Sequence, residues 1–508
     1  MRRFKRTAAA VLTAAMAVSL LSGCVGDGSG TGGQTQAQNE TQAGGQTQGA
    51  SGDGQASASG EVGKPASITW MVHTGLNEEN GTAQWAEEFE RLTGIKMNLN
   101  IISNNEYKQM LELSFASDTV PDVFDLNGEN LAVYAKQNAI ADLTDLIKGS
   151  ELYGKVDPEM WESITLNGRI YGIPQETPSG AVTYVRKDWL DRLGMDIPKT
   201  YDEYIEMLRR FKNEIPECKV PVTAPGKGAA TLSINLPEFF LGATQDFVVR
   251  DGKWVDGMSE EGMVQALTNL QAAYAEGLVD TELITNTTSN CRDQWYAGSV
   301  GVFNYWGGLW GKTLLERVQQ NVPEAEVVAI PPIEGAVYEF STPNIYCING
   351  RLPKEQVESL FKYFLEYMND GKEGQVLFQN GVEGLHWEQD GEYIKQLPTL
   401  SNPEETLQKA WITPWLGIAP MELTDKKVEI AQPVTDSLAI INEYGKKKQV
   451  LPVSETLTKV KADLQALKEE VVAKIIMGDM TVEEGLARYK SESEMYNIGK
   501  VLEEMNAQ

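Results

Sequence analysis

The chain has 508 residues, of which 42% are hydrophobic and 23% charged, and its formal net charge is −28. A chain of this length accommodates two or three ordinary domains, and its hydrophobic share is that of a globular protein. The negative charge argues against direct binding of nucleic acid or anionic lipid, although a local basic pocket would still admit an anionic ligand.

The first 24 residues have the pattern of an export signal. Four basic residues lie within the first six, the stretch 7–21 carries no charge, and Leu21-Ser22-Gly23-Cys24 closes the segment. This tetrapeptide resembles the lipobox of bacterial lipoproteins, in which the cysteine receives a lipid and becomes the mature first residue. The alternative is an ordinary secretory signal with a coincidental cysteine. We therefore expect a signal peptide over 1–23, lipidation of Cys24 and an extracytoplasmic, membrane-anchored protein.

Residues 24–66 should form a disordered tether. Beyond Cys24 the segment consists mainly of Gly, Ser, Gln, Thr and Ala, so it cannot bury enough apolar surface to offset the entropy of ordering. A flexible chain of this length spans about 35 Å root-mean-square. Such a tether would hold a folded body away from the membrane.

The folded body begins with alternating strand and helix patterns. They predict strands over 67–73, 96–102 and 122–126, a helix over 82–93 ended by Gly94, and a helix through Tyr107, Leu111 and Phe115. This alternation indicates a parallel sheet covered by helices. The first turn lacks the glycine fingerprint of dinucleotide-binding proteins.

A second α/β region begins near Ala181. The predicted elements are a strand over 181–186, a helix opened by the capping box of Thr200 and Glu203, a helix over 263–274, a strand over 297–305, an extended segment over 326–333 and a helix over 357–368. Mostly helical sequence with tryptophans follows to the end. Trp70, Trp85, Phe89 and Trp189 fit helix or strand faces and are assigned to the core.

Several short motifs occur in an order that resembles extracellular solute-binding proteins of ATP-binding-cassette importers. They are 93–96 (TGIK), 117–123 (SDTVPDV), 167–174 (NGRIYGIP), 184–190 (YVRKDWL), 198–203 (PKTYDE) and 297–303 (AGSVGVF). In the last motif Ser299 stands where a lysine is usual. The resemblance covers nearly all of the chain after the tether and is strongest to large lipoproteins that bind oligosaccharides, a group similar to alginate-oligosaccharide-binding proteins.

The resemblance implies an α/β, two-lobed type II periplasmic-binding-protein fold with hinge strands and a cleft between the lobes. The first lobe would comprise 67–179 plus 307–375, and the second 180–306 plus 376–508. Many relatives carry a calcium loop after the capped helix, but 211–221 lacks its alternating oxygen ligands and its turn glycine, so no metal or other cofactor is expected. The expected partners are a small-molecule ligand and membrane permease subunits, with the receptor itself a monomer.

Sugars offer C–H faces to flat aromatic rings and hydroxyls to amides and carboxylates, so the candidate contacts are aromatic or polar residues at strand ends and in glycine-flanked loops. They are Tyr305, Trp306, Glu383, His386, Trp387, Trp411, Trp415, Gln175, Glu176, Asn127, His73 and Asn77. One of Tyr305 and Trp306 could instead pack at the hinge, and hinge packing is the favoured interpretation of Trp310.

Other functions are less well supported by the sequence. Residues 297–301 miss a Gly-x-Ser-x-Gly elbow by one residue, and the chain has no phosphate loop, no His-Glu-x-x-His motif and only two histidines. A glycosidase needs only two carboxylates, which 72 acidic residues could always supply. Two alternatives to a non-enzymatic oligosaccharide receptor remain. One is a receptor of the same fold for a peptide or other small solute, and the other is a surface polysaccharide-binding or hydrolysing protein. Cys218, Cys291 and Cys347 are expected to be mostly buried free thiols, with one disulfide possible.

Overall fold

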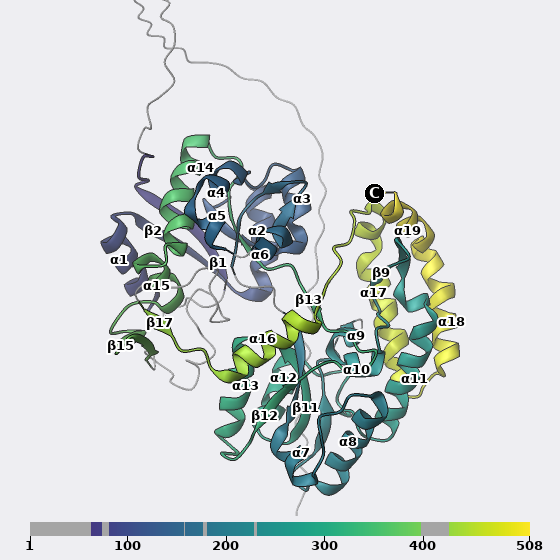
Figure 1. Ribbon diagram of the computed structural model, residues 1–508. Helices are drawn as coiled ribbons and strands as arrows, with labels where there is room; N and C mark the ends of the chain where they lie inside the picture. Colours follow the sequence, from purple (N-terminus) through teal and green to yellow (C-terminus); the bar gives the residue numbers. More distant parts are fainter. Residues whose placement is uncertain are drawn as a thin grey trace, which may run out of the picture. The chain divides into compact units, whose positions relative to one another are not determined.

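The computed structural model describes residues 62–73, 81–156, 158–175, 180–227, 231–397 and 426–507, and Figure 1 labels their helices and strands. Outside these residues lie the signal-like segment with Cys24, most of the expected tether, and four expected ligand contacts: Asn77, Glu176, Trp411 and Trp415. Two separate β-sheets organise the described part, and each is the centre of one lobe.

The first sheet has the strand order β2-β1-β3-β14-β6. Its strands are β1 (Ser67–His73), β2 (Lys96–Ile102), β3 (Val123–Leu126), β6 (Ile173–Pro174) and β14 (Ile345–Ile348). β1 pairs in parallel with β2 and β3, as the strand–helix alternation predicts, whereas β14 pairs antiparallel with β3 and β6. Because β14 comes from far along the chain, local periodicity could not place it in this sheet.

Helices and short strands complete the first lobe. They are α1 (Thr82–Thr93), α2 (Asn104–Ala116), α3 (Leu131–Lys136), α4 (Thr144–Gly149), α5 (Glu151–Lys155), α6 (Pro158–Ile164), β4 (Thr165–Leu166), β5 (Arg169–Ile170), α14 (Lys354–Leu360), α15 (Glu373–Asn380), β15 (Trp387–Asp390), β16 (Tyr393–Gln396) and β17 (Lys427–Val428). After α14 the chain continues through a π-helical turn, Phe361–Glu366, and a 3₁₀ turn, Tyr367–Asn369, where the sequence predicts one continuous helix.

The second sheet has the strand order β12-β7-β11-β8. Its strands are β7 (Ala181–Arg186), β8 (Val220–Thr223), β11 (Val300–Trp306) and β12 (Val327–Ile330). β7 pairs antiparallel with both β11 and β12, and β8 pairs in parallel with β11. Two further strand pairs belong to this region: β9 (Phe247–Arg250) with β10 (Lys253–Asp256), and β13 (Glu339–Phe340) with β18 (Lys446–Lys447).

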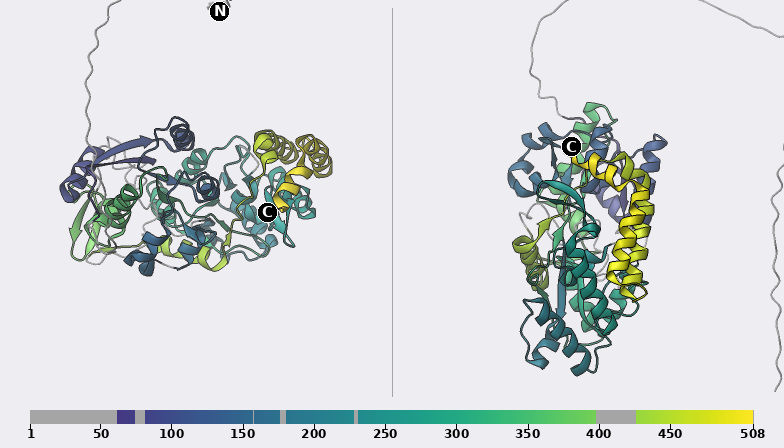
Figure 2. Two further views of the ribbon diagram at one scale, coloured as in Figure 1. Left: turned by 90° about the horizontal axis from the view of Figure 1, so that it is seen from above. Right: turned by 90° about the vertical axis from the view of Figure 1, so that its right-hand side faces the viewer.

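The helices of the second lobe are α7 (Lys187–Leu193), α8 (Tyr201–Glu214), α9 (Leu232–Asn235), α10 (Pro237–Phe240), α11 (Glu261–Ala275), α12 (Thr288–Tyr296), α13 (Leu309–Gln319), α16 (Gln432–Tyr444), α17 (Glu455–Ile476), α18 (Val482–Ser493) and α19 (Ile498–Asn506). The views in Figures 1 and 2 agree that α17 and α18 lie side by side, and both pack on α11. The predicted capping box of Thr200 and Glu203 is present at the start of α8. Among the described residues, no helix is both long and apolar enough to cross a bilayer.

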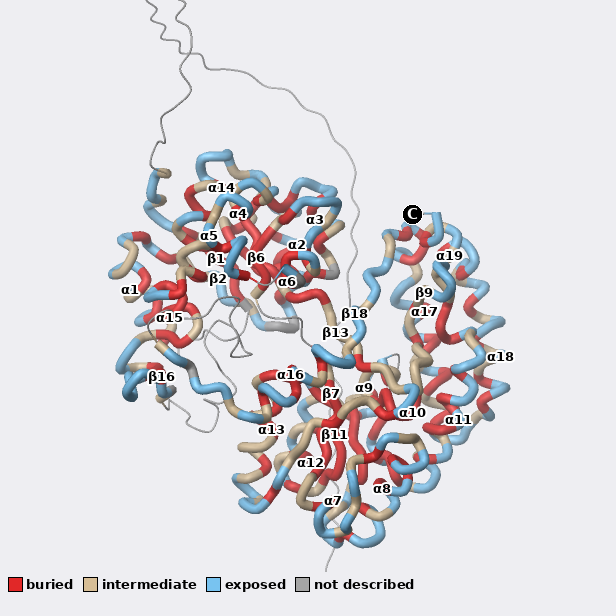
Figure 3. Tube along the Cα trace, viewed as in Figure 1, coloured by how far each residue is buried: buried red, intermediate tan, exposed pale blue. Residues whose placement is uncertain are grey.

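Each lobe has its own apolar core, and Figure 3 shows the buried residues concentrated along the strands. The four aromatic residues assigned to the core are confirmed there, since Trp70, Trp85 and Phe89 are fully buried and Trp189 is 1% exposed. The three cysteines of the folded body are free thiols; Cys291 and Cys347 are buried and Cys218 is half-buried.

The structure corrects the expected lobe boundaries. β12 pairs with β7, α13 packs on β11 and β13 pairs with β18, so 309–340 belongs with the second lobe and not with the first. Conversely, α15 packs on the first core, where the Trp85 indole donates to the carbonyl of Leu377 at 3.0 Å. The folded body also begins before residue 67, because the carbonyls of Val62 and Gly63 accept hydrogen bonds from side chains of the α14 region.

Candidate functional site at two sheet edges

One edge of the first sheet gathers three of the expected ligand contacts. His73 is the last residue of β1, Asn127 directly follows β3, and Gln175 directly follows β6. Ile345, the first residue of β14, pairs with both Leu126 and Pro174, so the ends of β3 and β6 lie on either side of the same strand. Polar groups at the ends of parallel strands are the usual material of binding sites in open α/β sheets.

The side chains at this edge carry hydrogen-bonding capacity suited to a polar ligand. Asn127 is exposed, and its backbone carbonyl accepts from the amide of Asn130 at 2.9 Å. The backbone amide of Gln175 donates to the carbonyl of Asn344 at 2.9 Å, which fixes the position of this residue. Its side-chain Nε2 is buried and has no hydrogen-bond partner within the described part of the chain. An unpaired buried donor is costly, so this amide is a candidate to bind a ligand hydroxyl.

The matching edge of the second sheet ends in an exposed tryptophan. Trp306 closes β11 opposite Ala181 of β7, and its side chain is 43% exposed. Its backbone carbonyl accepts from the Tyr184 hydroxyl at 3.0 Å, and the next amide, Gly307, donates to the carbonyl of Gly180 at 2.8 Å. A side chain on Gly307 would meet Ile441 at 2.6 Å. The backbone around Trp306 is therefore held on several sides while its ring remains exposed.

The structure separates Tyr305 from Trp306, although both are expected ligand contacts. Tyr305 is 8% exposed, stacks on Phe303 with ring centroids 4.9 Å apart, and meets Trp310 edge-on at 4.9 Å. Its burial raises the pKa of the phenol to about 12. Because consecutive strand residues face opposite sides, Trp306 points away from this core while Tyr305 fills it. Of the two, Tyr305 is the packing residue, and so is Trp310.

Chain connectivity ties the two edges together. Only six residues, 175–180, connect β6 of the first sheet to β7 of the second, so Pro174 and Ala181 can be at most about 25 Å apart. A second connection runs from the end of β12 to the start of β14 and joins the same two edges. The edge bearing Asn127 and Gln175 and the edge bearing Trp306 are therefore the ones that the chain holds near each other.

A buried polar cluster lies behind the Trp306 edge. The Thr183 hydroxyl donates to Glu238 Oε1 at 2.6 Å and accepts from the Asn304 amide at 3.0 Å. The Tyr338 hydroxyl lies 3.1 Å from the same oxygen of Glu238. Burial of the Glu238 side chain, which is 1% exposed, raises the pKa of its carboxyl group. Thr183 is two residues after Ala181, and Asn304 is two residues before Trp306. The cluster therefore fixes β7 and β11 close to the edge that bears Trp306.

Replacing Glu238 with glutamine is expected to stabilise the fold at neutral pH. Because the carboxyl pKa is higher in the folded state than in the unfolded state, the wild type loses stability as pH rises above about 4.5, until the folded pKa is passed. Glutamine keeps the acceptor oxygen but cannot ionise, so the variant escapes this loss, which is about 1.4 kcal/mol for every tenfold difference in the acid dissociation constant between the two states. Melting temperatures should coincide near pH 4 and diverge towards pH 7. The exposed Glu206→Gln serves as the control, and coincident curves at pH 7 would contradict the prediction.

The glycine-flanked loop after α15 is built differently from expectation. The side chains of His386 and Trp387 are 2% and 3% exposed. His386 Nδ1 accepts from the amide of Val382 at 2.8 Å, and the Trp387 indole donates to the carbonyl of Gly381 at 2.9 Å. Both side chains thus shape the loop itself, whereas Glu383 is exposed. Trp387 and Glu383 do border a cavity of about 270 Å³ with Lys426, whose ammonium lies 5.6 Å from the indole ring.

With this geometry in view, comparison with known proteins identifies the family. Residues 75–365 match the model of the bacterial extracellular solute-binding proteins. The chain belongs to this family. That membership confirms the resemblance inferred from the ordered motifs, and the two-lobed α/β fold is the one expected.

Individual relatives are distant in sequence. The chain is 24% identical to lipoprotein LipO of Bacillus subtilis over 324 residues, which cover 59% of this chain and 63% of LipO, less than two thirds of that protein. It is also 24% identical to the fructooligosaccharide ABC transporter substrate-binding protein FusA of Streptococcus pneumoniae, with 72% of this chain and 69% of FusA covered. Among solved structures, the alginate-binding protein AlgQ2 without calcium ion matches with a TM-score of 0.61 at 18% identity, covering 87% of this chain and 98% of AlgQ2.

Sequence reasoning missed the buried cluster of Thr183, Glu238, Asn304 and Tyr338. One signal was available, since Asn304 is a polar residue inside the otherwise apolar strand Val300–Trp306 and therefore needs a buried partner. The partners themselves come from three other segments of the chain, and no local pattern brings those segments together. The Lys446-Lys447-Lys448 run was equally visible, but its surroundings depend on the tertiary fold.

Proposed function

We propose that this protein is the substrate-binding component of an ATP-binding-cassette importer and that it captures an oligosaccharide between the two sheet edges. The observation that carries the proposal is Trp306, an exposed indole on a fixed backbone at the edge that the shortest chain connection joins to the edge of Asn127 and Gln175. An indole face packs on the C–H face of a sugar ring, and the amides of the other edge supply donors and acceptors for its hydroxyls.

The relatives support a saccharide over a peptide as the solute. FusA, which is similar to this chain in sequence, is named for fructooligosaccharides. AlgQ2, which is similar in fold, is named for alginate. Binding between lobes that are joined by hinge segments allows closure on the ligand and its release to membrane permease subunits. The receptor makes and breaks no covalent bond in this scheme, so we assign it no enzymatic role. His73, Asn77, Glu176, Glu383, Trp411 and Trp415 remain proposed contacts, and His386 and Trp387 are proposed to act through the loop that they shape.

The N-terminal segment completes the proposal. A lipid on Cys24 would hold the receptor at the outer face of the membrane as a monomer, and the Gly/Ser/Gln-rich stretch would let it reach the permease. LipO, one of the relatives, is itself named a lipoprotein. Metabolic labelling of the chain with a fatty acid tests this part, because an ordinary secretory signal would leave the protein unlabelled and released.

A saccharide panel tests the main function. The melting temperature of the chain without residues 1–23 is measured with neutral and acidic oligosaccharides of two to six units, and with a matched set of short peptides. Stabilisation by at least one oligosaccharide class, with a dissociation constant confirmed by calorimetry, is the expected result. Stabilisation by peptides alone would replace the saccharide with the runner-up solute. Appearance of shortened saccharides in the same samples would favour the hydrolase alternative.

A further inference from the structure

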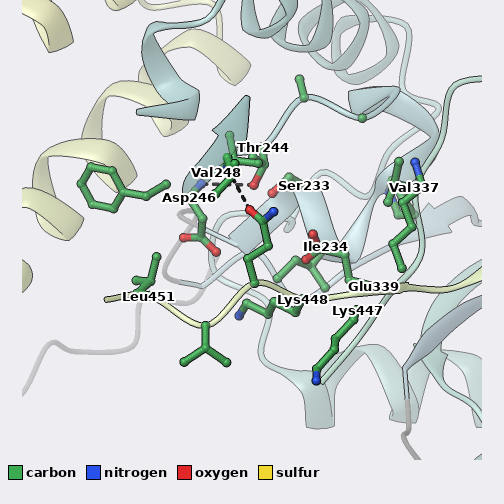
Figure 4. A pocket seen from close by; sticks show the side chains of 18 of the residues that line it. Ser233, Ile234, Thr244, Asp246, Val248, Val337, Glu339, Lys447, Lys448 and Leu451 are labelled. Atoms are coloured by element: carbon green, nitrogen blue, oxygen red, sulfur yellow. Dashed lines mark hydrogen bonds between the residues drawn. The ribbon is translucent and has the colours of Figure 1, made fainter. Parts of the chain in front are cut away.

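A basic cavity of about 400 Å³ lies beside the β13–β18 strand pair (Figure 4). Residues of the second lobe make up most of its lining, and Asn130 of the first lobe also borders it. Ala181, the register partner of Trp306, lines one part of it, so the cavity reaches the sheet edge at which we place the saccharide. An inference about the ligand class of this cavity therefore rests on that proposed function.

The charges lining the cavity run against those of the whole protein. Five basic side chains border it, and two acidic ones, in a chain whose net charge is −28. The basic residues are Arg250, Lys446, Lys447, Lys448 and Lys461, and the acidic ones are Asp246 and Glu339. Such a local reversal raises the concentration of anions at this place while the rest of the surface repels them.

The frame of the cavity is held by backbone pairing. Lys446 N donates to the carbonyl of Tyr338 at 2.9 Å, and Lys448 N donates to that of Phe340 at 2.8 Å. Val249 N of β9 donates to Gln449 Oε1 at 2.8 Å, and this bond joins β9 to the segment that follows β18. Lys446 is the first residue of β18 and Lys448 directly follows that strand, and both border the cavity.

The remaining basic groups come from separate elements. Lys461 lies on α17 and is exposed, whereas Arg250 on β9 pairs with Glu260 at 3.1 Å. Val248 and Leu451 add apolar wall, and Ser233 and Thr244 add hydroxyls, all four labelled in Figure 4. A cavity with ammonium groups, hydroxyls and apolar surface suits a sugar that carries a carboxylate, since the ring packs on the wall and the acid meets the lysines.

We propose that this cavity binds the carboxylate groups of an acidic oligosaccharide, so that the receptor prefers uronate-containing saccharides to neutral ones. The ammonium groups of Lys446, Lys448 and Lys461 supply the preference. A lysine ammonium is a point charge with three hydrogen-bond donors, and it binds any small oxyanion. Phosphate and sulfate are therefore the chemical competitors that the test includes.

The test compares trigalacturonate with its methyl ester, which has the same sugar units and no charge. The tethered chain without residues 1–23 should bind the acid about tenfold more tightly than the ester in calorimetry at low salt. The variant Lys446→Gln/Lys448→Gln/Lys461→Gln should bind both about equally. A control variant, Lys219→Gln/Lys459→Gln/Lys490→Gln, makes the same change in net charge at exposed lysines that do not border the cavity, and it should keep the preference.

The outcomes separate the two proposals. Three results together support the basic cavity. The wild type and the control variant prefer the acid, the Lys446/Lys448/Lys461 variant does not, and 0.5 M salt weakens the preference of the wild type. The carboxylate-binding proposal is overturned if the wild type binds acid and ester equally, or if the Lys446/Lys448/Lys461 variant still prefers the acid. In both cases the proposed saccharide capture stands. Binding of inorganic phosphate or sulfate without either saccharide overturns the carboxylate assignment. If no saccharide of any class binds, the proposed function fails together with this inference.

Discussion

Replacing Lys468 with methionine is expected to lower the free energy of unfolding of the second lobe by about 3–5 kcal/mol. Lys468 on α17 is 6% exposed, and its ammonium lies 3.5 Å from Asp256, which is 5% exposed. The same ammonium donates to the carbonyl of Gln245 at 2.5 Å and lies 5.0 Å from the Phe247 ring. Methionine fills much of the same volume but leaves a buried carboxylate without its counter-charge.

The cost arises from Asp256 more than from the lost contact itself. Asp256 Oδ2 accepts from the Ser259 hydroxyl at 2.8 Å, and Oδ1 accepts from the Tyr489 hydroxyl at 3.1 Å. These neutral donors cannot replace a positive charge in a low-dielectric surrounding. The double variant Asp256→Asn/Lys468→Met removes both charges and should recover most of the stability, because replacing a whole buried pair is often close to neutral.

Urea unfolding followed by tryptophan fluorescence measures these differences. The control is the exposed pair of Arg209 and Glu276, 2.6 Å apart, because Arg209→Met removes an ion pair that solvent already screens. Its midpoint should change far less than that of Lys468→Met. If Lys468→Met unfolds at the wild-type urea concentration, or if the double variant is as unstable as the single one, Lys468 does not stabilise the lobe as the counter-charge of Asp256.

Local pattern was enough to predict most elements but not how they group into lobes. The strands Ser67–His73, Lys96–Ile102 and Ala181–Arg186 and the helix Thr82–Thr93 have the bounds that alternation, helical spacing and Gly94 predict. The prediction that β12 belongs to the first lobe is wrong, because β12 pairs with β7 of the second sheet. Which strand a segment pairs with depends on which sheet edge is available to it in the folded protein. A periodicity in sequence contains no information about that choice.

The candidate site shows the same division between local and tertiary information. Asn127, Gln175 and Trp306 could be proposed because strand ends and a glycine-bounded aromatic are visible in sequence, and the structure places them at edges that the chain holds near each other. Whether an aromatic ring points outwards or into the core depends on the register of its strand. That register exposes Trp306 and buries Tyr305, and it is fixed by pairing with β7, a strand more than 100 residues earlier.

Trp306→Ala should weaken binding of the best saccharide from the panel by about 30-fold or more, which corresponds to a loss of about 2 kcal/mol. A large flat ring on a fixed backbone loses little conformational entropy on binding, so its contact energy is retained in the affinity. The substitution should leave the melting temperature of the free protein nearly unchanged, because the side chain is 43% exposed and the hydrogen bond from Tyr184 reaches only the Trp306 carbonyl.

Two further variants make the Trp306 test specific. Trp306→Phe keeps a flat ring and should restore most of the affinity, whereas Tyr444→Ala removes an aromatic ring of similar exposure, 41%, from the end of α16 and should change nothing. Calorimetry of all four proteins against the same saccharide gives the comparison. Equal affinity of Trp306→Ala and wild type would remove the stacking ring from the proposed site. No other aromatic side chain in the described strands β7, β8, β11 and β12 is exposed, so none of them could take its place.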